Sequence, residues 1–242
     1  MRVAAPLDLA VELRKLPLFA ELPRHLFADL AARAHGVRID RDRPIVVEGE
    51  STAGVPILVQ GLVKISMGRV LIDVHRGPCL PFAAGAVEAG PSPVTVTAMR
   101  ACDVAVLDRA VFLAAVTSTP ATAQRLADTI AREARSYLRR VPELVGGSVE
   151  ERLVSLLDRL SERHGSPLDE GRYMALPLRR CDLAMMVHAT TETVSRTLAE
   201  WERRSWLRSN RAGLWWGSRR MREGTLTSAP PPPRPKSDRP EI

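Results

Sequence analysis

The spacing of hydrophobic and polar positions changes twice along the chain. From about Leu7 to His35, apolar residues recur at helical intervals, and the segment Leu22-Pro23-Arg24-His25 is typical of a helix start. From about Val37 to Asp108, short apolar runs alternate with turn residues. Helical spacing returns at Arg109. The pattern therefore predicts helices on both sides of a central β region.

Six short apolar runs in the central region predict β-strands. Glycines separate these runs, and short strands at close spacing with glycine turns are typical of an antiparallel barrel or sandwich. The expected strands are Pro44–Val47, Val55–Val59, Leu62–Ser66, Val70–Val74, Val94–Ala98 and Val104–Leu107. We expect one β domain of roughly seventy to eighty residues.

The longest predicted helix runs from Pro120 to Leu144, with Thr119 as its N-terminal cap. Its apolar residues follow 3-4-3-4-3 spacing, which places them in one seam, as in a two-stranded coiled coil. The seam consists of Ala127, Ile130, Ala134, Tyr137, Val141 and Leu144. Such a seam serves either self-association or packing of the helix on its own β domain. Pro142 interrupts the pattern and should kink or end the helix nearby.

A hinge and a further helix are expected after this point. Gly146-Gly147 is the hinge candidate, and Ser148 with Glu151 forms a capping box. The helix should continue to about His164, and its buried face would carry Leu153, Leu156, Leu157 and Leu160. A polar loop is expected over 165–172.

The most informative stretch lies between Leu178 and Leu207, where two short helices are predicted. A tight turn is expected at Val187-His188-Ala189, and Thr190 should cap the second helix. The expected buried positions are Leu183, Ala184 and Val187 on the first helix and Val194, Leu198 and Trp201 on the second. The following segment, Trp206 to Trp216, predicts a β-hairpin wing. This pattern indicates a winged helix-turn-helix.

The second helix would expose a polar face at its N-terminal end, formed by Thr191, Glu192, Ser195 and Arg196. A helix in the DNA major groove reads bases with that end. Arg196 can bond guanine O6 and N7 together, and Glu192 can accept a hydrogen bond from cytosine N4. Hydroxyl groups and arginines nearby are expected to contact phosphate. These candidates are Arg179, Arg180, Thr190, Thr193 and Arg203.

The distribution of charge favours double-stranded DNA as the partner. The chain carries a formal net charge of +7, supplied mainly by arginine. Residues 179–223 contain ten arginines and five acidic residues, a difference of +5. An arginine-bearing helix face is, however, more often simply solvated. The alternative function is therefore an effector-binding or protein-interaction module whose helix-turn-helix no longer reads DNA.

Several other classes of protein are disfavoured by the sequence. The three cysteines, Cys79, Cys102 and Cys181, form no CxxC motif, which favours a reducing, cytoplasmic compartment. Charged residues interrupt the N-terminal segment, which argues against a signal peptide. An uncharged apolar run long enough for a membrane span is not found. The sequence also has no phosphate loop, HExxH or GxSxG motif, so we expect no enzyme.

Three blocks of the sequence resemble, in order, the CRP/FNR family of bacterial transcription regulators. The first is Leu16–Phe19 with Val46–Glu50, which resembles the start of a cyclic-nucleotide-binding-type β-roll. The second is Pro120–Arg152, which resembles the dimerisation helix and its hinge. The third is Arg180–Leu207, which includes the Glu-Thr-Val-Ser-Arg string at Glu192–Arg196.

This resemblance implies a homodimer whose two recognition helices enter successive major grooves of a palindrome. Glu192, Ser195 and Arg196 match the base-reading positions of the FNR branch, which implies TTGA-like half-sites. Arg180 and Thr190 match phosphate-contacting positions. A regulator of this family is also expected to contact RNA polymerase.

The sensor region departs from the cyclic-AMP-binding members of the family. Ala83-Ala84 replaces their Gly-Glu pair, and Ser92-Pro93 replaces the arginine pair that neutralises the cyclic phosphate. Tyr137 and Leu138 replace the small hydroxyl residues near the base. Since burying an unpaired phosphate costs several kcal/mol or more, we expect no useful affinity for cyclic AMP or cyclic GMP. The candidate effector pocket consists of Phe82, Ala83, Ala84, Ser92 and Tyr137.

No cofactor is predicted. An iron–sulfur cluster needs about four cysteines, and none precedes Cys79. Haem binding through His75 and Cys79 is an alternative to the favoured interpretation of a strand-end histidine and a small buried thiol. An apolar pocket lined by Leu80, Phe82 and Val87 would hold an apolar ligand or nothing.

The expected fold class is therefore α+β, with a β-roll (jelly-roll), a long helix and a winged helix-turn-helix. The expected domains are an N-terminal helix and β-roll sensor over 1–118, a dimerisation helix over 119–146 and a DNA-binding domain over 147–222. The remaining segment, 223–242, includes four consecutive prolines, Pro230–Pro233, and is expected to be a disordered tail.

Overall fold

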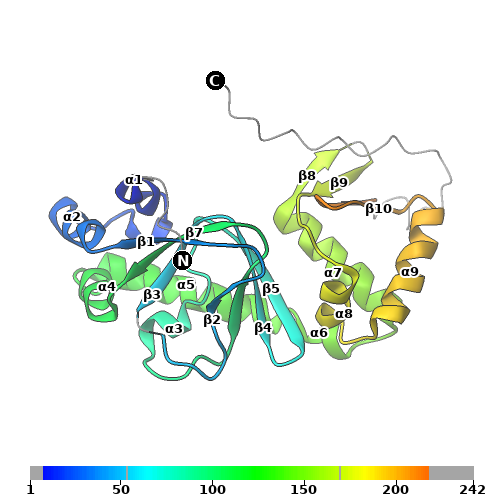
Figure 1. Cartoon of the computed structure of the whole chain (residues 1–242), viewed down its shortest axis with the longest axis horizontal. Helices are drawn as coiled ribbons and strands as arrows, with labels where there is room; N and C mark the ends of the chain where they lie inside the picture. Colours follow the sequence, from blue (N-terminus) through cyan, green and yellow to red (C-terminus); the bar gives the residue numbers. More distant parts are fainter. Residues whose placement is uncertain (1–7, 53, 169, 218–242) are drawn as a thin grey trace. The chain divides into compact units, whose positions relative to one another are not determined.

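The computed structural model describes residues 8–52, 54–168 and 170–217. The chain divides into two compact units, with the boundary between Arg140 and Val141 (Figure 1). The proline-rich segment 223–242 and the last residues of the expected DNA-binding domain lie outside the described residues.

The first unit begins with short helices, as the sequence predicts. Asp8 caps α1 through hydrogen bonds from the backbone of Ala10 and Val11. The helices are α1 (Leu9–Arg14), the 3₁₀ helix η1 (Pro17–Phe19) and α2 (Arg24–Ala32). Pro23 occupies the N-cap of α2, in agreement with the expected helix start.

Seven strands follow in the described part of this unit, and the six expected runs are all among them. Their bounds are β1 (His35–Ile39), β2 (Pro44–Val46), β3 (Val55–Gln60), β4 (Leu62–Met67), β5 (Val70–Arg76), β6 (Thr95–Ala98) and β7 (Cys102–Leu107). Strand β1 was not expected as a separate element. Its side chains are exposed or half-buried, so its sequence carries only a weak strand pattern.

The strands form two antiparallel sheets with the orders β1-β7-β3 and β2-β6-β4-β5. Buried side chains from both sheets meet in one apolar cluster, which includes Leu58 and Val104 from the first sheet and Ile65 and Val96 from the second. A second cluster packs helices against the first sheet and contains Phe19, Phe112 and Leu126. The β-roll is therefore covered by helices on one side, as Figure 1 shows.

Three further helices belong to this unit: α3 (Ala84–Val87), α4 (Arg109–Val116) and α5 (Pro120–Leu138). Thr119 caps α5 and forms a capping box with Thr122, so the predicted start of this helix is confirmed. Leu126 faces the apolar core, and α5 is packed on the β-roll of its own unit.

The predicted continuation of the long helix to Leu144 was wrong, whereas the break expected near Pro142 is confirmed. Helix α5 stops at Leu138, and Val141–Val145 forms a separate short helix, α6. A proline at position 142 has no N–H to donate to the carbonyl of Leu138, so a continuous helix would lose that hydrogen bond. Val141 and Leu144 therefore lie on another helix and do not extend the seam on α5.

The predicted seam on α5 is also rotated relative to the exposed apolar stripe. Ile130 and Tyr137 are half-buried, and Ile130 packs against the core of its own unit. The stripe that remains exposed consists of Ala127, Ala131, Ala134 and Leu138, at 4-3-4 spacing. Leu138 is 71% exposed. The long helix thus uses one face for its own core and leaves a second apolar face uncovered in the single chain.

The second unit contains α7 (Val149–His164), whose Ser148–Glu151 capping box and four buried leucines are confirmed. The polar loop expected over 165–172 was wrong, because strands β8 (Gly165–Leu168) and β9 (Gly171–Met174) form a hairpin there. Because most positions of this hairpin are exposed or half-buried, its sequence lacks the alternation of apolar and polar residues that predicts strands. Strands β10 (Leu207–Ser209) and β11 (Leu214–Trp216) complete a sheet of order β10-β11-β9-β8.

Among the described residues, no helix has the length and apolar character needed to cross a membrane.

Candidate nucleic-acid interface and sensor site

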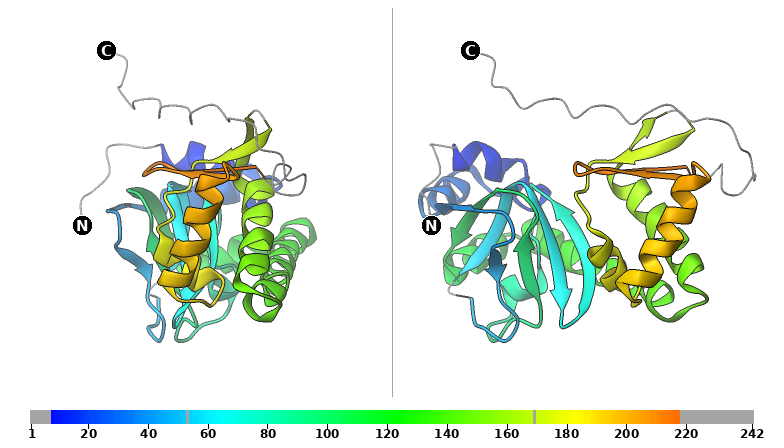
Figure 2. Two further views of the ribbon diagram at one scale, coloured as in Figure 1. Left: turned by 90° about the vertical axis from the view of Figure 1, so that its right-hand side faces the viewer. Right: turned by 45° about the vertical axis from the view of Figure 1, so that its right-hand side comes forward.

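Helices α8 (Arg180–Met186) and α9 (Thr191–Arg203) form the predicted two-helix motif (Figure 2). All six apolar positions expected to be buried are buried, and Met186 joins them. The Thr190 side chain accepts a hydrogen bond from the backbone of Thr193 and so caps α9. Helix α9 therefore presents its polar positions outward, because its opposite face is packed into the core.

The turn between the two helices depends on His188, which adopts a left-handed backbone conformation with φ of 49°. This conformation costs a non-glycine residue about 1–2 kcal/mol. The arginine side chain of Arg152 holds the turn from α7, because its Nε donates to the carbonyl of Val187 at 3.0 Å. The turn is thus fixed by contacts from outside the motif.

Two tryptophans, Trp201 on α9 and Trp216 on β11, connect α9 to the rest of the second unit. The Trp201 Nε1 donates to Glu150 of α7 at 3.1 Å, and the Trp216 Nε1 donates to Asp158 at 2.7 Å. The Trp201 and Trp216 rings lie against each other with centroids 5.2 Å apart. Helix α9, helix α7 and the terminal hairpin are therefore joined through one buried aromatic pair.

The outward face of α9 carries the residues expected to read bases. Glu192 and Arg196 project into solvent, with 81% and 75% of their side chains exposed, and their charged groups lie 3.8 Å apart. Thr191 and Arg203 are exposed on the same helix, whereas Thr193 and Ser195 are half-buried. The structure thus brings Thr191, Glu192, Arg196 and Arg203 to the accessible side of one helix.

The remaining arginines differ in how they are held. The Arg180 guanidinium contacts the carbonyl of Ser195 at 3.3 Å and Glu202 at 3.3 Å, so this side chain fastens α8 to α9. Arg179 is exposed next to the buried Asp182, whose carboxylate accepts from the Arg179 backbone at 2.9 Å. Arg203 pairs with Glu200. Arg180 therefore has a structural contact in addition to its expected phosphate contact.

The expected wing is confirmed as the antiparallel β10–β11 hairpin, in which Leu207 pairs with Trp216. The Asn210 side chain accepts hydrogen bonds from the backbone of Ala212 and Gly213 and so shapes the tip. Arg208 and the exposed Arg211 add positive charge to this hairpin.

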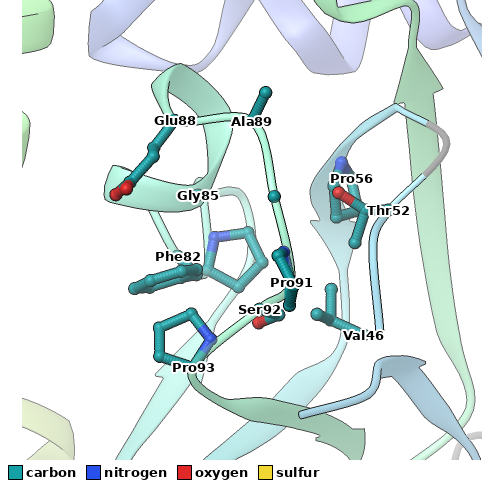
Figure 3. A pocket seen from close by; sticks show the side chains of 12 residues that line it. Val46, Thr52, Pro56, Phe82, Gly85, Glu88, Ala89, Pro91, Ser92 and Pro93 are labelled. Atoms are coloured by element: carbon teal, nitrogen blue, oxygen red, sulfur yellow. The ribbon is translucent and has the colours of Figure 1, made fainter. Parts of the chain in front are cut away.

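The residues expected to form an effector pocket in the first unit fall into two groups. Phe82 and Ser92 line a cavity (Figure 3), whereas Ala83, Ala84 and Tyr137 meet at the carboxylate of Glu133 on α5. Of the two other residues expected to line an apolar pocket, Leu80 belongs to the core and Val87 is exposed.

The Glu133 carboxylate is the central group of this contact. Its Oε2 accepts hydrogen bonds from the backbone N–H of Ala83 at 2.9 Å and of Ala84 at 3.3 Å. Its Oε1 accepts from the Tyr137 hydroxyl at 2.8 Å. Burial raises the pKa of Glu133, although these hydrogen bonds and the nearby His75 act in the opposite direction. A side chain from α5 thus supplies the anionic group that the backbone of segment 83–84 binds.

A second buried polar contact links α5 to β5. Asp73 is fully buried and accepts from Ser136 of α5 at 3.2 Å and from the backbone of Val74 at 2.8 Å. His75 lies 3.3 Å from the same carboxylate. This geometry fits the favoured interpretation of His75 as a strand histidine with a structural partner. Within the described parts of the chain, no three His, Cys, Asp or Glu side chains gather as a metal site would require.

Two residues that organise this region, Glu133 and Arg109, were not predicted from the sequence. Both act over long separations, Glu133 on 83–84 and Arg109 on Thr52, Gly85 and Glu88. Glutamate and arginine are common at exposed helix positions, so the local sequence pattern does not distinguish Glu133 and Arg109 from other surface residues. Only the spacing of Glu133 and Tyr137, four residues apart on one helix face, could have suggested a pair.

Comparison with known proteins agrees with this geometry. Residues 151–215 match the model of a Crp-like helix-turn-helix domain. A curated protein of Mycobacterium tuberculosis, described as a CRP-like cAMP-activated global transcriptional regulator, is 26% identical over 204 residues. That match covers 81% of this chain and 90% of the relative.

Solved structures with the same fold include FixK2 from Bradyrhizobium japonicum, with a TM-score of 0.65 and 24% identity. This match covers 82% of the present chain and 99% of FixK2. A CooA mutant from Carboxydothermus hydrogenoformans has a TM-score of 0.68 and 16% identity, with coverage of 92% and 97%. These similarities extend the match beyond the helix-turn-helix to the β-roll and the long helix.

Proposed function

We propose that this chain, which is similar to transcription regulators of the CRP/FNR type, acts as a homodimer that reads a palindrome and does not respond to cyclic AMP. The observation that carries the proposal is the face of α9, which presents Glu192 and Arg196 to solvent on a helix packed by its opposite side. The family consists of transcription regulators and not of enzymes. In this proposal the protein acts in the cytoplasm and contacts RNA polymerase.

Sequence recognition would come from the N-terminal half of α9. Arg196 is long and exposed enough to bond guanine O6 and N7, and Glu192 can accept from cytosine N4. Ser195 completes the pattern of the FNR branch, so we expect TTGA-like half-sites. The exposed Glu192–Arg196 ion pair would help to hold both side chains in position. Because exposed ion pairs contribute only about 0–1 kcal/mol, separating the two side chains on DNA binding would cost little.

Affinity would come from phosphate contacts around this helix. Thr190 and Thr193 lie at the N-terminus of α9, where backbone N–H groups favour anions. Arg179 is exposed at the start of α8, and Arg203 is exposed at the end of α9. Arg180 contributes by holding the two helices together as well as by its charge.

Dimerisation would use the exposed stripe of α5. Ala127, Ala131, Ala134 and Leu138 lie at 4-3-4 spacing on the solvent side of a 19-residue helix. Two such stripes can pack as a coiled coil, and the small alanine side chains allow the helices to approach closely. A dimer would present two recognition helices to half-sites one helical turn apart.

Independence from cyclic nucleotides is supported by Glu133. A cyclic phosphate bound at the backbone of Ala83 and Ala84 would have to displace a carboxylate that already accepts both N–H groups. The described segment 80–93 contains no lysine or arginine to neutralise the phosphate, and Ser92 binds its own loop through Val94. Calorimetric titration with cyclic AMP should therefore give no binding in the micromolar range, and micromolar binding would contradict this part of the proposal.

DNA recognition can be tested by fluorescence anisotropy on a labelled duplex with two TTGA-like half-sites in a palindrome. The protein should bind this duplex more tightly than a scrambled duplex of equal composition. Raising the salt from about 50 mM to about 200 mM should weaken binding steeply, because phosphate contacts release counterions. Equal affinity for both duplexes would instead favour a module whose helix-turn-helix no longer reads DNA.

A further inference from the structure

The side chain of Arg152, near the start of α7, donates hydrogen bonds to two backbone carbonyls that lie far apart in the chain. Its Nε donates to the carbonyl of Val187 at 3.0 Å, and its Nη1 donates to the carbonyl of Gly147 at 2.9 Å. Val187 is the C-cap of α8, and Gly147 immediately precedes Ser148, the N-cap of α7. One planar guanidinium group therefore joins the turn before α9 to the segment that enters α7.

Both carbonyls lie where the chain changes direction through a left-handed residue. Gly147 has a φ of 62°, and His188, which follows Val187, has a φ of 49°. A Cβ at position 147 would collide with the Glu151 carboxylate, so this turn requires glycine both for its φ and for its missing side chain. Arg152 thus holds the chain at two turns, one on each side of its own helix start.

The chain on either side of these turns is also fixed. Before Gly147, the buried Glu143 of α6 accepts hydrogen bonds from Arg159 of α7 at 2.7 and 3.2 Å, which fastens α6 to α7. After Val187, Thr190 caps the end of α9 that is proposed to read bases. The connection from segment 141–147 to that end of α9 therefore runs through α7 and the Arg152 guanidinium.

We infer that Arg152 is a positioning residue that sets the direction of α9 relative to segment 141–147, and thereby the half-site spacing that the homodimer accepts. This inference rests on the proposed homodimer and states how its preference for one spacing arises. Both α9 helices of a dimer must reach their grooves at once, so a rigid connection confines binding to one spacing. A loosened connection lets each helix adjust, and neighbouring spacings then bind almost as well.

Two variants separate this role from general stability. Arg152→Lys keeps the positive charge, but its single ammonium lacks the planar fork with which arginine serves two acceptors. Leu160→Val removes packing from a fully buried position of the same helix and leaves both hydrogen bonds of Arg152 in place. It is the control for a loss of stability in the second unit.

Spacing preference is measured by anisotropy titrations of the full-length protein on palindromes whose spacers differ by one base pair. The unmodified protein and Leu160→Val should bind one spacing at least about tenfold more tightly than its neighbours, because a wrong spacing prevents simultaneous engagement. Arg152→Lys should reduce this preference to about threefold or less and should bind a duplex with one half-site as tightly as the unmodified protein. A purely destabilising change would lower all affinities alike and keep the preference.

Hydrogen exchange followed by mass spectrometry tests the bridge without DNA. In Arg152→Lys, the backbone amides of segments 147–149 and 188–190 should both exchange at least about threefold faster, because both turns open more easily. Leu160→Val should not accelerate these two segments more than the rest of the second unit.

Two results would overturn the inference: an unchanged spacing preference in Arg152→Lys, or faster exchange at neither segment or at one of them alone. If the unmodified protein preferred no spacing, the proposed reading of a palindrome would fail, and the spacing role of Arg152 with it. Because the exchange measurement uses no DNA, failure of the bridge is distinguishable from failure of the proposed DNA recognition.

Discussion

The indole nitrogen of Trp201 donates a hydrogen bond to Glu150 at 3.1 Å, and this bond joins the recognition helix α9 to the first turn of α7. Trp201 is buried, so loss of the acceptor would leave its N–H without that partner. Glu150→Ala should lower the free energy of unfolding by about 1–3 kcal/mol, the cost of leaving a buried donor unsatisfied. Urea unfolding followed by circular dichroism measures this loss.

Glu150→Gln separates the hydrogen bond from the charge. Both substitutions remove a negative charge from the start of α7, which contributes about 0.3–1 kcal/mol through the helix dipole. Only glutamine retains an oxygen that can accept from Trp201. The glutamine protein should therefore lose less stability than the alanine protein, and equal losses would show that the bond to Trp201 is unimportant.

The left-handed backbone at His188 leads to a second prediction. His188→Gly should keep or raise the stability of the second unit, because glycine adopts a φ of 49° without a steric penalty. His188→Val should lower the free energy of unfolding by about 1–2 kcal/mol relative to glycine, because β-branched residues strongly disfavour this conformation. The His188 side chain is exposed, so lost packing does not explain the difference.

The comparison is made by urea unfolding of the two variants beside the unmodified protein. Ala189→Val, at the next position, is the control for adding a β-branched side chain to the same turn. If glycine and valine at 188 were equally stable, the turn would tolerate the left-handed residue without strain.

Local pattern predicted most elements of this fold because their signals are local. The capping box of Ser148 and Glu151, the cap at Thr119 and the alternating strands such as Val55–Gln60 depend on a few neighbouring residues. The hairpin at 165–174 was missed because its side chains are mostly half-buried or exposed, and its pairing is with β11 as well as within itself.

The exposed polar face of α9, which we propose reads bases, could also be predicted, because helical periodicity separates Glu192 and Arg196 from the buried Val194 and Leu198. The sensor region could not be predicted in the same way. Its organisation rests on Glu133, which reaches residues fifty positions earlier in the chain. A contact of this kind leaves no periodic signal, so it became visible only in three dimensions.

The Glu133 contact predicts a pH dependence of stability. Burial raises the pKa of Glu133 in the folded chain above its ordinary value. At a pH between the ordinary glutamate pKa and the raised pKa of folded Glu133, the folded protein holds a proton that the unfolded chain releases. The free energy of unfolding therefore falls as the pH rises from the first pKa through the second. Glu133→Gln has no proton to release. Relative to this variant, the unmodified protein should be most stable below the ordinary glutamate pKa and lose stability as the pH rises through the raised pKa.

Urea unfolding of both proteins at intervals from about pH 4 to about pH 7 measures this difference. The control is Glu50→Gln, which removes an exposed carboxylate from the same unit. A difference between Glu133→Gln and the unmodified protein that does not vary with pH would contradict the prediction. The same variant, titrated with cyclic AMP, shows whether the internal carboxylate alone excludes the phosphate.

The exposed stripe of α5 predicts how the dimer can be broken. Leu138→Glu and Ala134→Glu would place carboxylates in the proposed helix–helix interface, where each would face the same charge of the partner chain at a cost of several kcal/mol. Light scattering after size exclusion should give the mass of one chain for these variants and of two for the unmodified protein. Arg132→Glu, exposed on the same helix but off the stripe, is the control and should remain dimeric. A dimer that survives both stripe variants would place the interface elsewhere.

The sharpest prediction concerns base reading by Arg196. Arg196→Ala should reduce affinity for the cognate palindrome by about 1–3 kcal/mol per half-site and should relax specificity at one base pair, because a bidentate contact to guanine is lost. Arg203→Ala is the matched control, since it removes an exposed arginine from the other end of α9 and should weaken binding to all duplexes alike. Anisotropy titrations on the cognate duplex and on duplexes with each half-site base changed in turn measure both effects. If Arg196→Ala lowered affinity equally for every duplex, Arg196 would contact phosphate only, and base recognition would have to come from other residues of α9.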